Sequence, residues 1–228
     1  MPAITFLTDI DNTLIDNDRV KADMEARIRA LAGEAGGQQF WELYEDVRRE
    51  LDYVDLPITL ARFRALRPDV RKFPQMSSML LGYPFEDALF PGALEVIRHL
   101  QGFGTVVVLS DGDPVFQPAK IARIGVADAV DSNVLIYAHK EDHIDEVMDL
   151  YPARHYVLID DKAGILARAK VHLGPRMTTV HVRQGKYATS SDTDADPAPD
   201  ISLEGIAEIL ELGEDDFAPP GRAGAPGG

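Results

Sequence analysis

Three short apolar runs, rich in β-branched residues, limit the folds open to this chain more than any other feature. They are Ile4 to Leu7, Thr105 to Leu109 and Tyr156 to Ile159. Hydrophobicity sustained over so short a length is typical of strands covered on both faces, as in a parallel sheet. Segments with helical spacing lie between and after these runs, and Thr178 to Val182 predicts a further strand. The alternation of strand and helix predicts an α/β fold.

The helices of this core are predicted from apolar residues at steps of three and four. We expect one helix after Pro91, one ending near Tyr151 and one that closes the chain. The apolar positions are Leu94, Ile97 and Leu100 in the first, Ile144, Val147, Met148 and Tyr151 in the second, and Leu203, Ile206, Ala207 and Leu210 in the third.

The segment 17–86 differs from the rest, because it has repeated helical spacing and no convincing strand. Two apolar stripes predict helices within it: Val20, Met24, Ile28 and Leu31, then Phe40, Leu43, Tyr44, Val47 and Leu51. We therefore expect a core of residues 1–16 and 87–212, a helical insertion of 17–86 and a flexible Pro/Gly tail of 213–228. The polar segment from Gly185 to Asp200 is also expected to be loosely ordered.

Composition excludes several classes of partner and site. The 228 residues carry a formal net charge of −15, which repels phosphate backbones and anionic membranes, so neither nucleic acid nor a membrane is an expected partner. No apolar run approaches the length of a membrane span, and no export signal is visible, so we expect a cytoplasmic protein. The absence of cysteine excludes disulfides, thiolate metal sites and cysteine nucleophiles.

Small polar or acidic residues follow each of the three main runs. They are Asp9, Asp11 and Thr13 after the first, Ser110 after the second, and Asp160 and Asp161 after the third. Ligands of parallel sheets bind beyond the carboxyl ends of the strands, so these side chains are expected to converge. Two carboxylates two residues apart raise each other's pKa, and such a pair makes physical sense chiefly if it binds a cation or divides acid and base roles. Carboxylates from two strand ends suit Mg²⁺.

Two simpler explanations for these polar residues compete with a shared site. Small polar residues also begin turns and cap helices, which remains an alternative for Ser110. A calcium-binding loop starting at Asp9 is excluded, because Leu14 and Val20 stand where such a loop needs glycine and a bidentate glutamate.

With these motifs in order, the chain resembles the haloacid dehalogenase superfamily of phosphohydrolases from about residue 4 to residue 183. The matching motifs are Asp9-x-Asp11-x-Thr13, then Ser110 after a strand, then Lys140, and lastly the pair Asp160-Asp161. Phe90-Pro91-Gly92 before a helix is also a family feature. The resemblance implies a Rossmann-like parallel sheet flanked by helices, with the insertion 17–86 as a helical cap. Lys120 is the alternative to Lys140 for the third motif, since Lys140 lies in a polar segment where a solvated lysine is common.

The resemblance implies a phosphatase, that is, a phosphoric monoester hydrolase acting on small phosphorylated metabolites. Asp9 would be the nucleophile that forms an aspartyl-phosphate, and Asp11 the general acid and base. Mg²⁺ would be held by Asp9, the backbone carbonyl of Asp11, and Asp161 or Asp160, with Asp161 preferred. The residues expected to hold phosphoryl oxygens are Thr13, Ser110 and Lys140.

Three other functions fit the same fold. A phosphomutase keeps the whole set of site residues, and a non-catalytic binding or regulatory member keeps only the fold. A haloacid dehalogenase needs neither metal nor acid, and family dehalogenases carry an aromatic residue where this chain has Asp11. One departure bears on metal binding: Ile165 and Leu166 stand where related phosphatases often place Asp or Asn.

Overall fold

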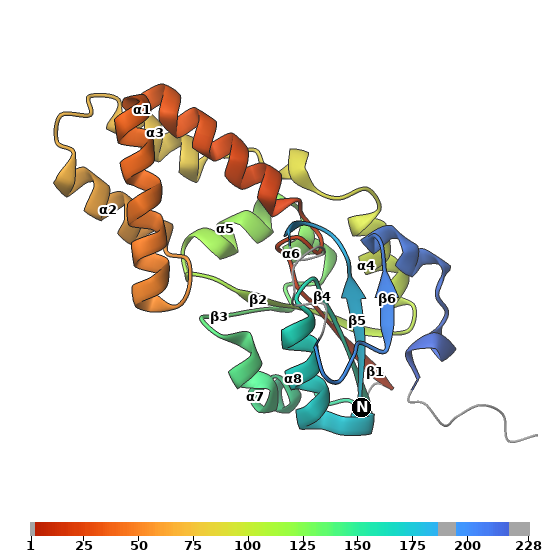
Figure 1. The fold of residues 1–228 in the computed structure, drawn as a ribbon. Coiled ribbons are helices and arrows are strands. Elements are labelled where there is room, and N and C mark those ends of the chain that lie inside the picture. The colour runs from red at the N-terminus through yellow and green to blue at the C-terminus, as the bar shows by residue number, and fades with distance from the viewer. Residues whose placement is uncertain (1–2, 187–194, 219–228) are drawn as a thin grey trace, which may run out of the picture.

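The computed structural model describes residues 3–186 and 195–218, and its centre is a six-stranded sheet. All neighbouring strands pair in parallel, in the order β3-β2-β1-β4-β5-β6 (Figure 1). The strands are β1 (Ile4–Thr8), β2 (Gly104–Asp111), β3 (Val134–Tyr137), β4 (His155–Asp160), β5 (Met177–Val182) and β6 (Ile201–Leu203). The predicted α/β, Rossmann-like sheet flanked by helices is confirmed, and the four strands expected from apolar runs are all present.

Helices cover both faces of this sheet, which explains why β1, β2 and β4 each contain a buried apolar run. They are α4 (Ala93–Gln101), α5 (Phe116–Arg123), α6 (Val126–Ala129), α7 (Ile144–Leu150) and α8 (Ala163–Leu173). Successive residues of β2 alternate between two buried clusters, because strand side chains point to opposite faces. Val106 and Val108 belong to the cluster that contains α4 and α5, whereas Val107 and Leu109 belong to the one that contains α7 and α8.

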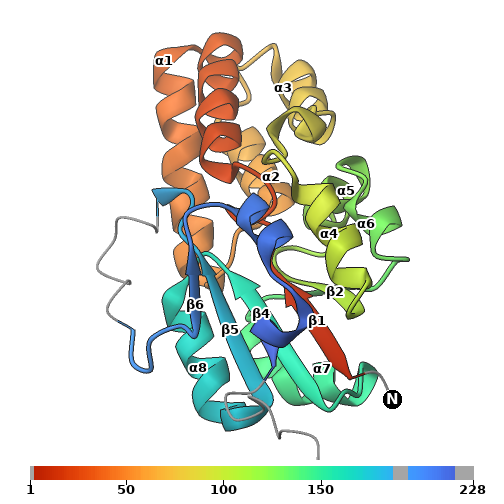
Figure 2. The ribbon, with the colours of Figure 1, turned by 90° about the vertical axis from the view of Figure 1, so that its right-hand side faces the viewer.

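The insertion between β1 and β2 is helical and lies at one end of the sheet (Figures 1 and 2). Its helices are α1 (Asn17–Leu51), α2 (Leu56–Leu66) and α3 (Phe73–Leu81). The two predicted stripes form the two arms of α1, which is kinked at Gly33, where φ is 78° and ψ is 169°. The arms lie against each other: Lys21 and Glu45 form an ion pair of 2.9 Å, and a Cβ at Gly37 would come within 3.0 Å of the Arg29 Cα. None of the helices in the described ranges combines the length and hydropathy that a membrane span requires.

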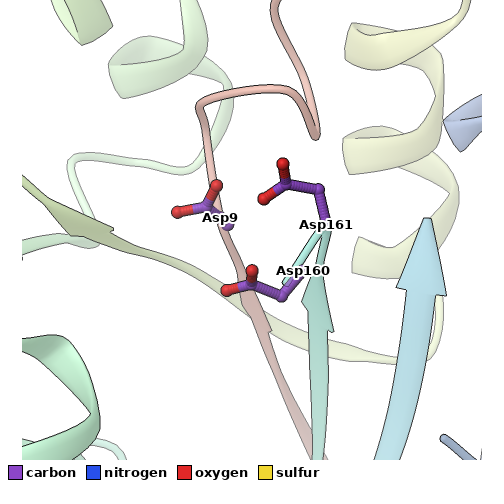
Figure 3. Close-up of side chains that lie close together, drawn as sticks. All are labelled: Asp9, Asp160 and Asp161. Atoms are coloured by element: carbon purple, nitrogen blue, oxygen red, sulfur yellow. The ribbon is translucent and has the colours of Figure 1, made fainter. Parts of the chain in front are cut away.

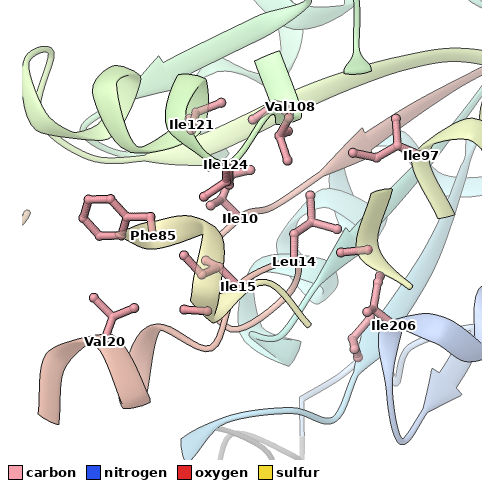
Figure 4. Close-up of a cluster of buried hydrophobic side chains, with 14 of the residues drawn as sticks. Ile10, Leu14, Ile15, Val20, Phe85, Ile97, Val108, Ile121, Ile124 and Ile206 are labelled. Atoms are coloured by element: carbon pink, nitrogen blue, oxygen red, sulfur yellow. The ribbon is translucent and has the colours of Figure 1, made fainter. Parts of the chain in front are cut away.

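The loop after β1 is folded tightly and carries the start of the first motif. The Ile10 carbonyl accepts hydrogen bonds from the amides of Thr13, Leu14 and Ile15 at 2.9 to 3.2 Å. Asn12 has φ of 60°, a left-handed conformation that asparagine adopts more readily than most residues. Ile10, Leu14 and Ile15 are fully buried in a cluster with Phe85, Ile121 and Ile206 (Figure 4). Apolar anchors on the loop therefore fix the backbone beside Asp9 and Asp11.

Four features differ from the sequence-based expectation or go beyond it. β3 and β6 were not predicted, because both are short edge strands and the residues of β3 are only half-buried. Where one closing helix was predicted, the structure has the strand β6 and then a 3-10 helix, Ile206–Glu211. The flexible tail was expected from residue 213, but Glu214–Phe217 forms a 3-10 helix whose Phe217 ring packs edge-on against Phe6 at 5.2 Å. Residues 187–194 and 219–228 of the two segments expected to be loosely ordered lie outside the described residues.

Candidate active site

Three carboxylates meet beyond the carboxyl ends of two neighbouring strands, at the end of the sheet that faces the helical insertion. Asp9 directly follows β1, Asp160 is the last residue of β4, and Asp161 comes next. β1 and β4 are paired along their length, and the Asp9 amide donates to the Ile159 carbonyl at 2.9 Å. One oxygen from each of the three carboxylates lies within 4.8 Å of the others, and Figure 3 shows the Asp161 carboxylate turned toward Asp9. All three side chains are buried.

Burial and neighbouring negative charge raise the pKa of two of these carboxylates, Asp9 and Asp161. Burial raises the pKa of Asp161 to about 9, and the charges of Asp160 and Asp9 add to the effect. Burial likewise raises the pKa of Asp9 to about 7, against an opposing effect of Lys140. Both carboxylate oxygens of Asp161 are buried without a hydrogen-bond partner among the residues described. A buried acid without partners is unfavourable, so this site is suited to receive a cation.

Lys140 lies at the centre of the cluster, so the alternative of a solvated surface lysine is wrong. Its Nζ forms ion pairs with Asp9 and, at 2.6 Å, with Asp160, and the side chain is 1% exposed. Burial lowers the pKa of Lys140, but the carboxylates of Asp160, Asp9 and Asp111 outweigh burial and raise the pKa well above its usual value. The Lys140 amide also donates to Asp111 Oδ1 at 2.9 Å. This hydrogen bond attaches the backbone at Lys140 to the last residue of β2.

Asp11 and Ser110 lie together beside α5, a short distance along the same sheet edge. The Asp11 side chain is 31% exposed, and its charge contributes to the raised pKa of Asp9. Asp11 Oδ1 accepts from Lys120 Nζ at 2.5 Å, and Asp11 Oδ2 accepts from Gln117 Nε2 at 3.2 Å. Gln117 Nε2 also donates to Ser110 Oγ at 2.8 Å. The Thr13 hydroxyl is buried and has no hydrogen-bond partner within the described ranges.

Comparison with known proteins gives the family of this chain. Residues 5–161 match the model of the haloacid dehalogenase-like hydrolases. The chain belongs to this family. A haloacid dehalogenase-like hydrolase from Burkholderia xenovorans LB400 has 46% sequence identity and a TM-score of 0.88, over 95% of this chain and 99% of its own. No curated protein matches the chain.

Two solved structures of lower sequence identity share the fold of the present chain. L-2-haloacid dehalogenase from Xanthobacter autotrophicus, with chloropropionic acid covalently bound, has 17% identity and a TM-score of 0.59, over 93% of this chain and 98% of its own. A magnesium-bound hydrolase of the family from Bacillus subtilis has 13% identity and a TM-score of 0.57, over 92% of this chain and 98% of its own. At these identities the likeness concerns the fold and not the substrate.

Sequence reasoning missed three members of the site in this hydrolase. Asp111 was not among the predicted site residues, but it joins β2 to Lys140 and, through Lys162 Nζ at 3.4 Å, to the fourth motif. Gln117 was not considered at all, although its spacing of three from Lys120 places both on one face of a helix. Lys162 follows the acidic pair directly; burial lowers its pKa, but Asp160, Asp9 and Asp111 raise it above the usual value.

The missing acid of the fourth motif has a structural explanation. Ile165 is 5% exposed and Leu166 is fully buried, and both pack in the cluster that also contains Leu158 and Met177. These positions face the sheet from α8, so an Asp or Asn there would be buried among apolar side chains. Any metal bound by this family member would therefore depend on Asp9, Asp160 and Asp161.

The residues present fit a magnesium ion. Asp9, Asp160 and Asp161 offer only oxygen atoms, which are the ligands that Mg²⁺ prefers. The unpartnered oxygens of Asp161 are the observation that favours a cation most directly, since a hydrogen-bond donor from the protein would otherwise be expected to satisfy them.

Proposed function

We propose that this hydrolase is a Mg²⁺-dependent phosphatase that removes phosphate from small phosphorylated metabolites through an aspartyl-phosphate on Asp9. The observation that carries this proposal is the meeting of three buried carboxylates, with the oxygens of Asp161 unpartnered and Asp11 beside them. A phosphate ester brings its own negative charge, and a cation is what allows a carboxylate to approach it.

In the first half-reaction, Asp9 attacks the phosphorus atom. A bond forms between an Asp9 oxygen and phosphorus, the bond from phosphorus to the leaving oxygen breaks, and Asp11 gives that oxygen a proton. In the second half-reaction, Asp11 takes a proton from water, and the water oxygen attacks phosphorus and releases Asp9 with inorganic phosphate. Thr13, Ser110 and Lys140 hold the phosphoryl oxygens in both halves, and Lys140 also offsets charge that develops on them.

Asp9, Asp161 and Asp160, with the backbone carbonyl of Asp11, are the groups that would hold Mg²⁺. When bound, the ion offsets repulsion between the carboxylate nucleophile and the phosphate. Asp161, whose pKa is raised to about 9 by burial and neighbouring charge, would give up its proton on binding the ion.

The helical insertion, residues 17–86, acts in this proposal as a cap that closes over the site and excludes water during transfer. An enclosed site favours a small substrate over a protein, and the net charge of −15 disfavours nucleic acid and membranes as partners. The insertion also carries a locally basic stretch, residues 62–72, with four arginines and one lysine. This stretch is a poor candidate for attracting an anionic substrate, because Arg62 and Arg67 already pair with Glu50 and Asp69.

Dehalogenation is the main alternative within the family, since dehalogenases are among the structures that share the fold. It uses a carboxylate nucleophile but has no need of leaving-group protonation or of a cation. Asp11, placed between two donors at the sheet edge, and the unpartnered Asp161 would then have no task. A phosphomutase remains an alternative, because it uses the same residues with phosphate returned to substrate.

A panel of phosphate monoesters tests the proposal, with release of inorganic phosphate measured in Mg²⁺ and in EDTA. We expect turnover in Mg²⁺ only, loss of turnover in Asp9→Asn, and full activity in the control Asp149→Asn, an exposed carboxylate of α7. Phosphate appearing on a second position of the substrate, instead of in solution, would indicate a mutase. Halide release from 2-chloropropionate in EDTA, with no phosphate released from any ester, would refute the phosphatase.

A further inference from the structure

Both oxygens of Asp11 are held by one face of α5. Lys120 Nζ donates to Oδ1 at 2.5 Å and Gln117 Nε2 donates to Oδ2 at 3.2 Å. Lys120 is 3% exposed and Gln117 is 4% exposed, whereas the Asp11 side chain that they hold is 31% exposed. Two buried donors therefore hold a carboxylate that is itself partly exposed.

The second hydrogen of the Gln117 amide links this contact to the phosphate site. Gln117 Nε2 also donates to Ser110 Oγ at 2.8 Å, so a single amide group joins Asp11 to Ser110. Because Ser110 lies in β2 and Asp11 lies in the loop after β1, their distance is set partly by this bridge. A fixed distance between a phosphate-binding hydroxyl and an acid is what leaving-group protonation requires.

Helix α5 is anchored firmly enough to act as a support. Asp113 Oδ1 accepts from the amides of Val115 at 2.9 Å and Phe116 at 2.7 Å, which fixes the start of the helix. Ile121, on the same buried side of the helix as Gln117 and Lys120, is 1% exposed. Gly112, with φ of 155°, leaves room for the glutamine: a Cβ there would lie 2.8 Å from Gln117 Cβ and Cγ.

We propose that Lys120 and Gln117 are positioning residues that hold the carboxyl group of Asp11 at the leaving-group oxygen of the substrate. This inference rests on the proposed phosphatase function and deepens it. The Asp11 side chain is partly exposed, and without these donors it is free to take other rotamers. A misplaced acid lowers the rate of the step in which it gives its proton, while substrate binding is hardly affected.

The test compares two phosphate esters that differ in their need for a proton. The leaving group of 4-nitrophenyl phosphate is a stable anion, whereas that of glycerol phosphate is an alkoxide that must be protonated. Lys120→Met and Gln117→Leu are expected to lower kcat/KM for glycerol phosphate by about 10- to 100-fold, a part of the roughly 100- to 10,000-fold that general acid catalysis contributes. With 4-nitrophenyl phosphate kcat/KM stays near the wild-type value, and Arg123→Met, a basic residue later in α5, changes neither ester.

A double-mutant cycle asks whether Lys120 acts through Asp11. In an Asp11→Asn background, Lys120→Met is expected to lower kcat/KM for glycerol phosphate no further, because the acid it positions is gone. Gly112→Ala gives a second route: it displaces Gln117 while all polar groups remain, and it is expected to show the same selective loss for glycerol phosphate.

Equal losses for the two esters would overturn the proposal, because a general folding defect lowers both alike. A raised KM with unchanged kcat would also overturn it, since Lys120 would then bind substrate directly. Both of these results leave the phosphatase intact. Absence of Mg²⁺-dependent phosphate release from the wild-type protein, by contrast, refutes the proposed function and this inference together.

Discussion

Removing the charge of Asp161 is expected to stabilise the metal-free protein at alkaline pH. Asp161 has its pKa raised from 3.8 to about 9, chiefly by burial and next by Asp160 and Asp9. A raised pKa in the folded state means that the acid contributes most to stability below pH 3.8, and that this contribution is lost as the pH rises through about 9. The metal-free protein should therefore become steadily less stable between pH 5 and pH 9.

The size of the effect follows from the same shift. One pKa unit corresponds to about 1.4 kcal/mol. At pH 8 the burial of Asp161 therefore lowers the free energy of unfolding by up to about 6 kcal/mol, because the same acid is ionised in the unfolded chain. Asp161→Asn has nearly the shape of the protonated acid and removes that dependence. Its free energy of unfolding should match the wild type near pH 4 and exceed it at pH 8 by several kcal/mol, with about 6 kcal/mol as the upper limit because water entry relieves part of the cost.

Chemical denaturation in EDTA across this pH range measures both quantities, and repeating it in Mg²⁺ tests the metal. Mg²⁺ should stabilise the wild type most at pH 8 and should stabilise Asp161→Asn little, since a ligand that binds only the folded state raises its stability. Asp149→Asn, an exposed acid on α7, should follow the wild type throughout. A wild type whose stability in EDTA is flat from pH 5 to pH 9, or an Asp161→Asn variant less stable than wild type at pH 8, would refute the reasoning.

Three further outcomes are expected. Lys140→Met removes the ammonium group that pairs with the buried carboxylates of Asp9 and Asp160, and should lower the free energy of unfolding by about 3–5 kcal/mol at pH 8. Lys21→Met, at a partly exposed ion pair, should lower it by about 0–1 kcal/mol. Mg²⁺ binding should release about two protons at pH 6 and about one at pH 8, because Asp9 and Asp161 have pKa values raised to about 7 and about 9. Calorimetry in buffers of different ionisation enthalpy counts the released protons. No release at either pH would contradict the assignment of Asp9 and Asp161 as metal ligands. Phe217→Ala should destabilise the protein by about 3–5 kcal/mol in urea denaturation, whereas a tail without packing would tolerate the change.

The parts of the fold that the sequence predicted well are those buried on both sides. The runs that became β1, β2, β4 and β5 are apolar because two layers of helices cover them, and that pattern is readable without any structure. The edge strands β3 and β6 escaped prediction because only one neighbour pairs with each, and partial exposure removes the unbroken apolar pattern. Phe217 was assigned to a flexible tail because the Pro/Gly-rich residues after it dominate the local composition.

The candidate site was predictable where residues follow strands and unpredictable where they lie within helices. Asp9, Asp160 and Asp161 come from strand ends that topology must bring together. Gln117 and Lys120 reach the site from the inner face of α5, and nothing local distinguishes them from the polar residues of any amphipathic helix. Their role depends on the rotation of α5 relative to β1, which tertiary packing decides.

Formal charges at the sheet edge connect these observations. Five carboxylates face three lysines there, so two formal negative charges remain uncompensated, which is the charge of one divalent ion. The carboxylates are Asp9, Asp11, Asp111, Asp160 and Asp161, and the lysines are Lys120, Lys140 and Lys162. Two of the lysines are divided between the tasks: Lys140 pairs with the acids that would bind metal, and Lys120 pairs with the acid that would transfer a proton. The arrangement therefore favours separate positions for phosphate capture and leaving-group protonation, as a phosphatase requires and a dehalogenase does not.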